Sequence, residues 1–104
     1  MTNKRLDEIR KRIHKIKAQL AAIDAMRPGS LTRQYKDPKN QSGAYYQLSY
    51  TREMKSRTEY VARDCVREVH REIANYKRFK ALTAAWVALS IEQSRLRMKL
   101  ARRA

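Results

Sequence analysis

The first quarter of the chain carries a pattern of apolar residues that only a paired helix explains. Six aliphatic residues recur with alternating spacings of three and four: Leu6, Ile9, Ile13, Ile16, Leu20 and Ile23. This heptad pattern predicts a helix over residues 1–27 that packs against a partner helix, because a narrow apolar seam is not stable alone in water. We expect Thr2 or Asn3 to cap its start and Pro28-Gly29 to end it.

The C-terminal part predicts a second, longer helix over residues 64–102, with Asp64 as its N-cap. A first apolar stripe consists of Val66, Val69, Ile73 and Tyr76. A second, heptad-spaced stripe consists of Leu82, Trp86, Leu89, Gln93, Leu96 and Leu100. The stripes are out of phase around Phe79, which indicates a change of partner. We expect the first half to cover a sheet and the second half to pair antiparallel with the first helix.

The middle segment, residues 30–62, has the composition of β-strands. The candidate strands are Ser30–Lys36, Ala44–Arg52 and Ser56–Ala62, with turn-forming residues over 37–43. A three-residue connection, Glu53-Met54-Lys55, pairs Arg52 with Ser56. One face then holds Tyr46, Leu48, Tyr50, Thr58, Tyr60 and Ala62. The other face holds Arg33, Tyr45, Gln47, Ser49, Thr51, Arg57, Glu59 and Arg63. A register slip of one residue would exchange the set contributed by the third strand.

These elements predict an α+β fold in a single domain, residues 1–104. Its architecture is a small antiparallel sheet of two to three strands at the tip of an antiparallel two-helix coiled-coil stalk. Because two helices alone leave apolar surface exposed, we expect the stalk to form a homodimer or to bind a larger protein. The expected interface residues are Ile9, Ile13, Ile16, Leu20, Trp86, Leu89 and Leu96.

The net positive charge of the chain favours an anionic partner. The formal net charge is +15 over 104 residues, with an isoelectric point near 10.6. Such a charge repels itself in the folded state, and a polyanion such as a nucleic acid is the common partner that offsets it. The alternative is an ordinary solvated surface with no specific partner.

The sheet is the favoured nucleic-acid surface, because a small sheet can enter the major groove and exposed tyrosines can stack on unpaired bases. The candidate binding residues are Arg33, Lys36, Lys39, Tyr45, Gln47, Arg52, Lys55 and Arg57. Tyr46, Tyr50 and Tyr60 are interpreted as core, and for Tyr45 both roles stay open. On the first helix, Arg5, Arg10, Arg12 and Lys17 flank the seam, and Glu92 is the one acid that could pair with them. The others contact either solvent or an anionic partner.

Catalysis, cofactors and metals find no support in the residue pattern. The chain has two histidines and one cysteine, and their spacing matches no zinc site. Two glycines in the whole chain leave no phosphate-binding loop. We therefore expect no enzymatic activity and no cofactor. No apolar run predicts a membrane span or a secretory signal, and the lone Cys65 fits a reducing compartment, so a cytoplasmic location is expected.

Several stretches together resemble a bacterial family of small proteins without assigned function. They are RPGSL (Arg27–Leu31), GAYYQLSY (Gly43–Tyr50), KSRTEYV (Lys55–Val61), NYKRFKAL (Asn75–Leu82) and WVALSIEQSRLRM (Trp86–Met98), within about three quarters of the chain. Many members carry a cysteine cluster between the first two strands, which implies a metal. This chain has Lys36–Ser42 there and no cysteine, so the resemblance transfers no metal site.

A second resemblance is at the level of the fold. Three strands followed by a helix, with the stretch YYQLSY, are similar to the N-terminal arm-binding domains of tyrosine-recombinase integrases, which read DNA through the sheet. The combined expectation is a non-enzymatic DNA-binding accessory protein of a phage or mobile element. The alternative is an interaction or assembly protein, or an RNA-binding subunit of a nucleoprotein complex.

Overall fold

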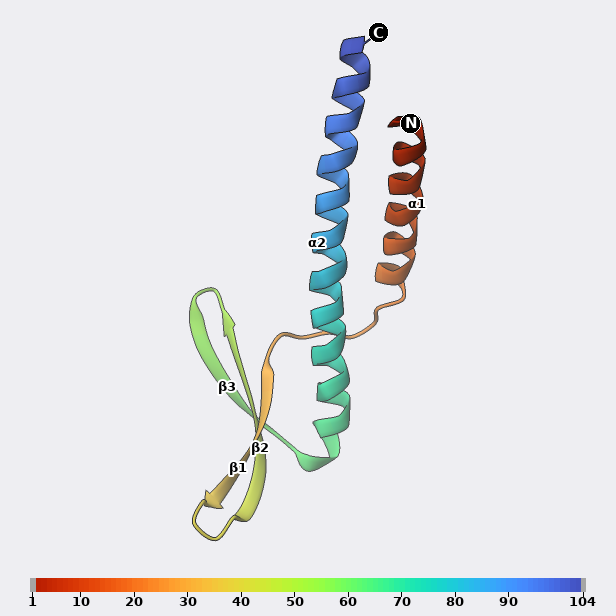
Figure 1. The fold of residues 1–104 in the computed structure, drawn as a ribbon. Coiled ribbons are helices and arrows are strands. Elements are labelled where there is room, and N and C mark those ends of the chain that lie inside the picture. Colours follow the sequence, from red (N-terminus) through yellow and green to blue (C-terminus); the bar gives the residue numbers. More distant parts are fainter. Residues whose placement is uncertain (1, 104) are drawn as a thin grey trace. The chain divides into compact units, whose positions relative to one another are not determined.

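The computed structural model describes residues 2–103 and contains two helices and three strands (Figure 1). Their order is α1 (Thr2–Ala21), β1 (Ser30–Asp37), β2 (Ser42–Arg52), β3 (Lys55–Val61), a short 3-10 helix (Arg63–Cys65) and α2 (Val66–Arg103). The predicted α+β class, with a three-stranded antiparallel sheet and a long second helix, is confirmed. The chain forms two compact units, with the boundary inside α2 between Lys77 and Arg78. We call residues 25–77 the sheet unit, and the remainder the helical unit.

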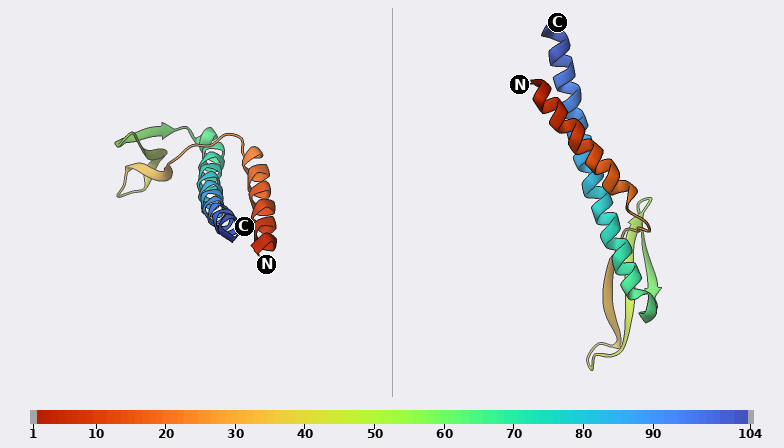
Figure 2. Two further views of the ribbon diagram at one scale, coloured as in Figure 1. Left: turned by 90° about the horizontal axis from the view of Figure 1, so that it is seen from above. Right: turned by 90° about the vertical axis from the view of Figure 1, so that its right-hand side faces the viewer.

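In the helical unit, α1 runs antiparallel to the C-terminal half of α2. Figure 1 and the left view of Figure 2 show the two helices side by side. The heptad residues Leu6, Ile9, Ile13 and Ile16 are all buried, and Ile9 is fully so. The second stripe of α2, from Leu82 to Leu100, is half-buried. The heptad pattern therefore identified the surfaces that the two helices bury against each other.

Helix α1 ends at Ala21, six residues before the expected end. Its last carbonyl groups accept hydrogen bonds from the amides of Ala22 and Ile23, in the tight geometry that closes a helix. The chain that follows is bound to α2 in the sheet unit: the Asn75 side chain donates to the Ala25 carbonyl at 2.8 Å, and the Arg27 amide donates to the Glu72 carbonyl at 3.2 Å. These bonds hold residues 25–27 in a non-helical path. The caps expected at Thr2 or Asn3 concern side chains outside those that the structure describes.

The sheet unit has a small core between the sheet and the first half of α2. Leu48 of β2 and Val61 of β3 pack against Val69 and Ile73 of α2. Half-buried neighbours complete this core: Leu31, Tyr46, Tyr50 and Val66. The expectation that the first stripe of α2 covers the sheet is confirmed. Gly29 lets the backbone just before β1 lie close to the Leu48 side chain, since a Cβ atom at this position would lie 2.6 Å from Leu48 Cδ1.

The strands lie in the order β1-β2-β3, and the β2–β3 connection differs from the prediction. Arg52 pairs with Lys55, so the turn has two residues, Glu53 and Met54. Both have positive φ, 53° and 65°, as a type I′ turn requires. The predicted three-residue connection is therefore wrong, and the register of β3 is shifted by one residue. Every β3 side chain consequently lies on the face opposite to the expected one.

The start of α2 also differs from the prediction. Asp64 lies inside the 3-10 helix rather than at a cap, and the residue that precedes this turn, Ala62, makes no side-chain capping bond. The Ala62 carbonyl accepts a hydrogen bond from the Cys65 amide at 2.9 Å. A tightened turn thus replaces the side-chain cap at this helix start.

Candidate nucleic-acid interface

The sheet has two faces of different chemistry. The covered face packs on α2 through Leu48 and Val61. The open face is built from residues of all three strands, and nearly all of them are uncharged and polar. Its members are Ser30, Thr32, Gln34, Lys36, Tyr45, Gln47, Ser49, Thr51, Ser56, Thr58 and Tyr60. Within the sheet unit no described element packs over this face, and Tyr60 is 72% exposed.

Gln47 lies at the centre of the open face. It pairs with Thr32 on one side and Tyr60 on the other, so the three side chains form one row across the sheet. In the next row Gln34 pairs with Tyr45. The Gln34 amide donates to the Thr32 hydroxyl at 3.2 Å, which orients both side chains. Within residues 2–103 the side-chain amide of Gln47 has no hydrogen-bond partner, so its donor and acceptor groups are available to a ligand.

An open depression adjoins this row. It is lined by Lys36, Gly43, Tyr45 and Tyr60 together with Ala44. Gly43 has a φ of +69°, and a Cβ atom there would lie 3.0 Å from Lys36 Cβ. The lining of the depression therefore combines one lysine with two tyrosines. This combination suits a planar group that carries negative charge nearby.

The eight predicted binding residues do not form one surface. Lys36, Tyr45 and Gln47 share the open face. Lys39 lies in the β1–β2 loop, and Arg52 and Lys55 flank the two-residue turn. The predicted placement of Arg33 and Arg57 beside Gln47 is wrong, since they pair with Tyr46 and Tyr50 on the covered face. The same shift places Thr58 and Tyr60 on the open face, so the assignment of Tyr60 to the core is wrong.

A polar cluster on the covered face was missed by the sequence reasoning. The Arg27 guanidinium donates to the Glu59 carboxylate and stacks over the Tyr50 ring at 5.2 Å. The hydrogen bond from Arg27, and then that from Tyr50, holds the pKa of Glu59 below its ordinary value. The observed register brings Glu59 and Tyr50 onto one face, whereas the predicted register separated them. This cluster ties the loop before β1 to β2 and β3.

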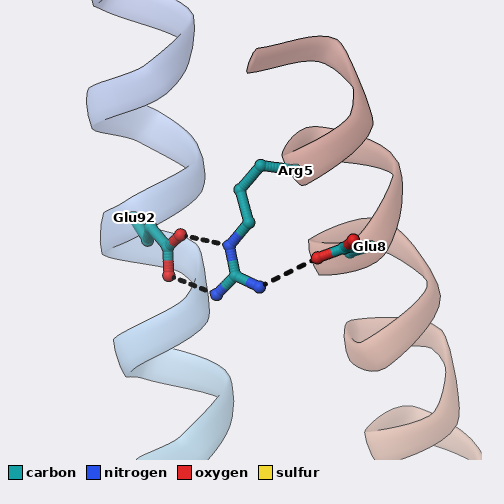
Figure 3. Close-up of polar contacts among 3 residues, drawn as sticks. All are labelled: Arg5, Glu8 and Glu92. Atoms are coloured by element: carbon teal, nitrogen blue, oxygen red, sulfur yellow. Dashed lines mark hydrogen bonds and ion pairs between the residues drawn. The ribbon is translucent and has the colours of Figure 1, made fainter. Parts of the chain in front are cut away.

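An ion pair joins Arg5 of α1 to Glu92 of α2, as Figure 3 shows. Arg5 Nε and Nη2 donate to the two carboxylate oxygens of Glu92 at 2.5 and 2.8 Å, and Arg5 Nη1 donates to Glu8 at 3.2 Å. The bond from Arg5 lowers the pKa of Glu92, and both carboxylates raise that of Arg5. The expectation that Glu92 would pair with a cation of the first helix is confirmed. Lys17 lies over the Trp86 ring, with 5.3 Å between Nζ and the ring centroid.

The predicted interface residues of the stalk lie inside the helical hairpin. Ile9, Ile13 and Ile16 are buried, and the other four are half-buried: Leu20, Trp86, Leu89 and Leu96. They are thus occupied in packing α1 against α2.

Positive charge is distributed unevenly between the units. The sheet unit holds eleven Lys/Arg against six Asp/Glu, a formal charge of +5. The helical unit holds fourteen against four, a formal charge of +10. The exposed cations of α1 include Lys4, Lys11, Arg12 and Lys15. The helical unit thus carries the larger share of the formal net charge.

Other functional groups are sparse in the part of the chain that the structure describes. No three His, Cys, Asp or Glu side chains between residues 2 and 103 gather where they could hold a metal ion. Over the same residues no helix combines the length and apolar character that crossing a bilayer requires. Cys65 is a free, exposed thiol.

Comparison with known proteins places the chain in a family. Residues 6–71 match the domain of unknown function DUF6788. The chain belongs to this family. The match includes the stretches at Arg27–Leu31, Gly43–Tyr50 and Lys55–Val61, and it ends before those at Asn75–Leu82 and Trp86–Met98. No curated protein and no solved structure matches the chain.

Proposed function

We propose that the protein is a non-enzymatic nucleic-acid-binding protein that contacts DNA through the open face of its sheet. The observation that carries the proposal is the row formed by Thr32, Gln47 and Tyr60. No described element of the sheet unit packs over this row, and among residues 2–103 the side-chain amide of Gln47 has no hydrogen-bond partner. An antiparallel sheet commonly packs one face on the core and leaves the other, polar face to solvent, where a ligand can reach it. Its uncharged amide, hydroxyl and phenol groups resemble those that contact base edges.

In this proposal, base contacts and phosphate contacts come from different residues. Base contacts come from the open face, where Gln47 offers the paired donor and acceptor that match adenine in the major groove. Phosphate contacts come from Lys36 on the open face, from Lys39, Arg52 and Lys55 at the ends of the strands, and from the exposed lysines of α1. Phosphate contacts supply affinity without sequence preference, whereas base contacts supply specificity.

Tyr45 and Tyr60 have different roles for single-stranded and for duplex ligands. Their rings border the depression beside Lys36. If the bound bases are unpaired, the rings stack on them, and each stacked ring contributes about 1–3 kcal/mol. If the ligand is a duplex, the rings line the groove and their hydroxyl groups contact bases or phosphates. Duplex DNA is favoured, because the row of Thr32, Gln47 and Tyr60 presents more hydrogen-bonding groups than stacking surfaces.

The test uses fluorescence anisotropy with a labelled duplex chosen by selection from random sequences, a scrambled duplex and a single strand of equal length. Gln47→Ala should weaken binding to the selected duplex by about 1–3 kcal/mol, with a smaller effect on the scrambled one. Arg12→Gln in α1 serves as the control, because it should weaken both duplexes alike. Both variants should unfold at the wild-type temperature.

Three results would contradict the proposal. The first is an affinity that stays flat as salt is raised, because phosphate contacts release counterions and must weaken. The second is that Gln47→Ala binds the selected duplex as tightly as wild type does, while Arg12→Gln no longer prefers the selected duplex to the scrambled one. The latter would move the base contacts to the helices. The third is that the protein binds no nucleic acid at low salt, which would favour the alternative role in protein assembly.

A further inference from the structure

The C-terminal half of α2 has a second apolar stripe that α1 does not cover. Val87 is 59% exposed, Ile91 47% and Met98 59%. These residues belong to a longer pattern with spacings of three and four, which we call the outer stripe. Its members are Ala84, Val87, Ile91, Ser94, Met98 and Ala101. An alternating three-four spacing of apolar and small residues is the pattern of a helix that packs against another helix.

The outer stripe faces away from the stripe that packs on α1. Each of its positions follows an inner position by one or two residues: Val87 follows Trp86, and Ile91 follows Leu89. At 100° per residue, this offset places the two stripes about 150° apart on the helix. One helix therefore presents two seams, of which α1 occupies one.

The residues that flank the outer stripe are basic or neutral. In heptad terms the flanks are Ala88, Arg95 and Arg102 on one side, and Thr83, Ser90 and Arg97 on the other. Beyond Ala84 the single acid of α2 is Glu92, which is engaged by Arg5. Flanking charges of one sign select a partner helix with flanking charges of the opposite sign.

We propose that the outer stripe is a docking surface for an amphipathic helix of another protein, with apolar residues at heptad spacing and glutamate or aspartate beside them. Val87, Ile91 and Met98 supply the apolar contacts, and the small Ala84, Ser94 and Ala101 allow close approach of the partner backbone. Arg95, Arg97 and Arg102 pair with the partner's acidic residues.

Three other occupants fit the stripe less well. A second copy of this chain brings no carboxylate to oppose Arg95, Arg97 and Arg102, and in parallel alignment it sets Arg97 beside Arg102 of the other copy. A nucleic acid would leave Val87 and Ile91 facing phosphates. A membrane surface needs a wide apolar face, whereas this stripe is narrow and half of its positions are Ala or Ser.

The test measures binding of the full chain to two synthetic heptad peptides that differ only in their flanking residues, one with glutamate and one with lysine. Both are used at concentrations where each peptide alone is monomeric. The glutamate peptide should bind saturably, and Val87→Ser/Ile91→Ser should weaken it by about tenfold or more, because two apolar contacts are lost. Met54→Ser, which removes an apolar side chain that is 98% exposed in the sheet unit, is the matched control and should leave binding unchanged.

A charge exchange makes the test specific. Arg95→Glu/Arg102→Glu should reverse the preference, so that the lysine peptide binds better than the glutamate peptide. All four positions changed in α2 are exposed, so the variants should keep the wild-type helical signal and unfolding temperature.

Four outcomes would overturn the proposal. The first is that the peptide does not bind, and the second is that Val87→Ser/Ile91→Ser binds it as tightly as wild type does. The third is that wild type self-associates and this double variant does not. The fourth is that wild type binds anionic vesicles but no peptide, and the double variant no longer binds the vesicles. The nucleic-acid assay on the same variants keeps the two proposals separate. If Gln47→Ala weakens DNA binding as expected but no peptide binds, the docking surface alone is rejected.

Discussion

The β2–β3 turn offers the sharpest test of the register that defines the open face. Glu53 and Met54 both occupy the left-handed region, at φ values of 53° and 65°, and neither is glycine or asparagine. A left-handed conformation costs an ordinary L-residue roughly 1–2 kcal/mol. Met54 is 98% exposed, so few contacts compensate this cost. Met54→Gly should remove the strain, and the greater freedom of glycine in the unfolded chain offsets part of the gain.

The net effect of Met54→Gly should be a stabilisation of about 1 kcal/mol, since the strain removed exceeds the added entropy of unfolding. For a unit of this size that corresponds to a rise in melting temperature of about 4–8 °C, which circular dichroism resolves. Met54→Ala is the first control and should change little, because alanine keeps the Cβ atom. Ser56→Gly, at a regular strand position, is the second and should destabilise by about 0.5–1 kcal/mol.

A neutral or destabilising Met54→Gly would refute the reasoning. It would mean that Met54 does not have positive φ and that the connection has three residues. Arg57 would then return to the face of Gln47, and Tyr60 to the core. The composition of the proposed binding surface would change with them.

Three other predictions test the packing of each unit. Leu48→Ala should destabilise the sheet unit by about 2–5 kcal/mol in urea unfolding, because Leu48 is fully buried between the sheet and α2; a loss below 1 kcal/mol would mean that this core is loose. Ile16→Asp should abolish the pairing of α1 with α2, because it buries a charge in the seam; circular dichroism equal to wild type would contradict this. Because folding lowers the pKa of Glu92, its ionised carboxylate stabilises the folded state. This contribution is present above the ordinary pKa of 4.5 and is lost as the pH falls through the lowered value. Glu92→Gln should therefore unfold with a flatter pH dependence below pH 5 than wild type, and parallel pH curves for the two proteins would show that the Arg5 pair is not linked to folding.

The sequence was sufficient to predict the helices, the strands and the partner of each half of α2. These features depend on apolar periodicity, which burial imposes residue by residue along the chain. The seam from Leu6 to Ile16 and the phase change near Phe79 are examples. The observed boundary between the compact units lies within two residues of Phe79.

The sequence was not sufficient where tertiary contacts or strained turns decided the outcome. Glu53-Met54 lacks the glycine or asparagine that marks a two-residue hairpin turn, so nothing local specified the register of β3. The end of α1 at Ala21 is coupled to contacts of the following residues with Glu72 and Asn75, far along the chain. The outer stripe has a weak apolar pattern in the sequence, because alanine and serine alternate with its larger apolar residues.

The most direct test of the central claim is a nuclear magnetic resonance titration of the labelled protein with duplex DNA. The account predicts that the largest changes in amide and side-chain shifts fall on the open face, above all on the side-chain amides of Gln34 and Gln47 and on the rings of Tyr45 and Tyr60. Smaller, salt-sensitive changes should appear along the exposed lysines of α1. Shifts confined to the helical unit, with those four side chains unaffected at saturation, would contradict the assignment of the sheet as the DNA-reading surface.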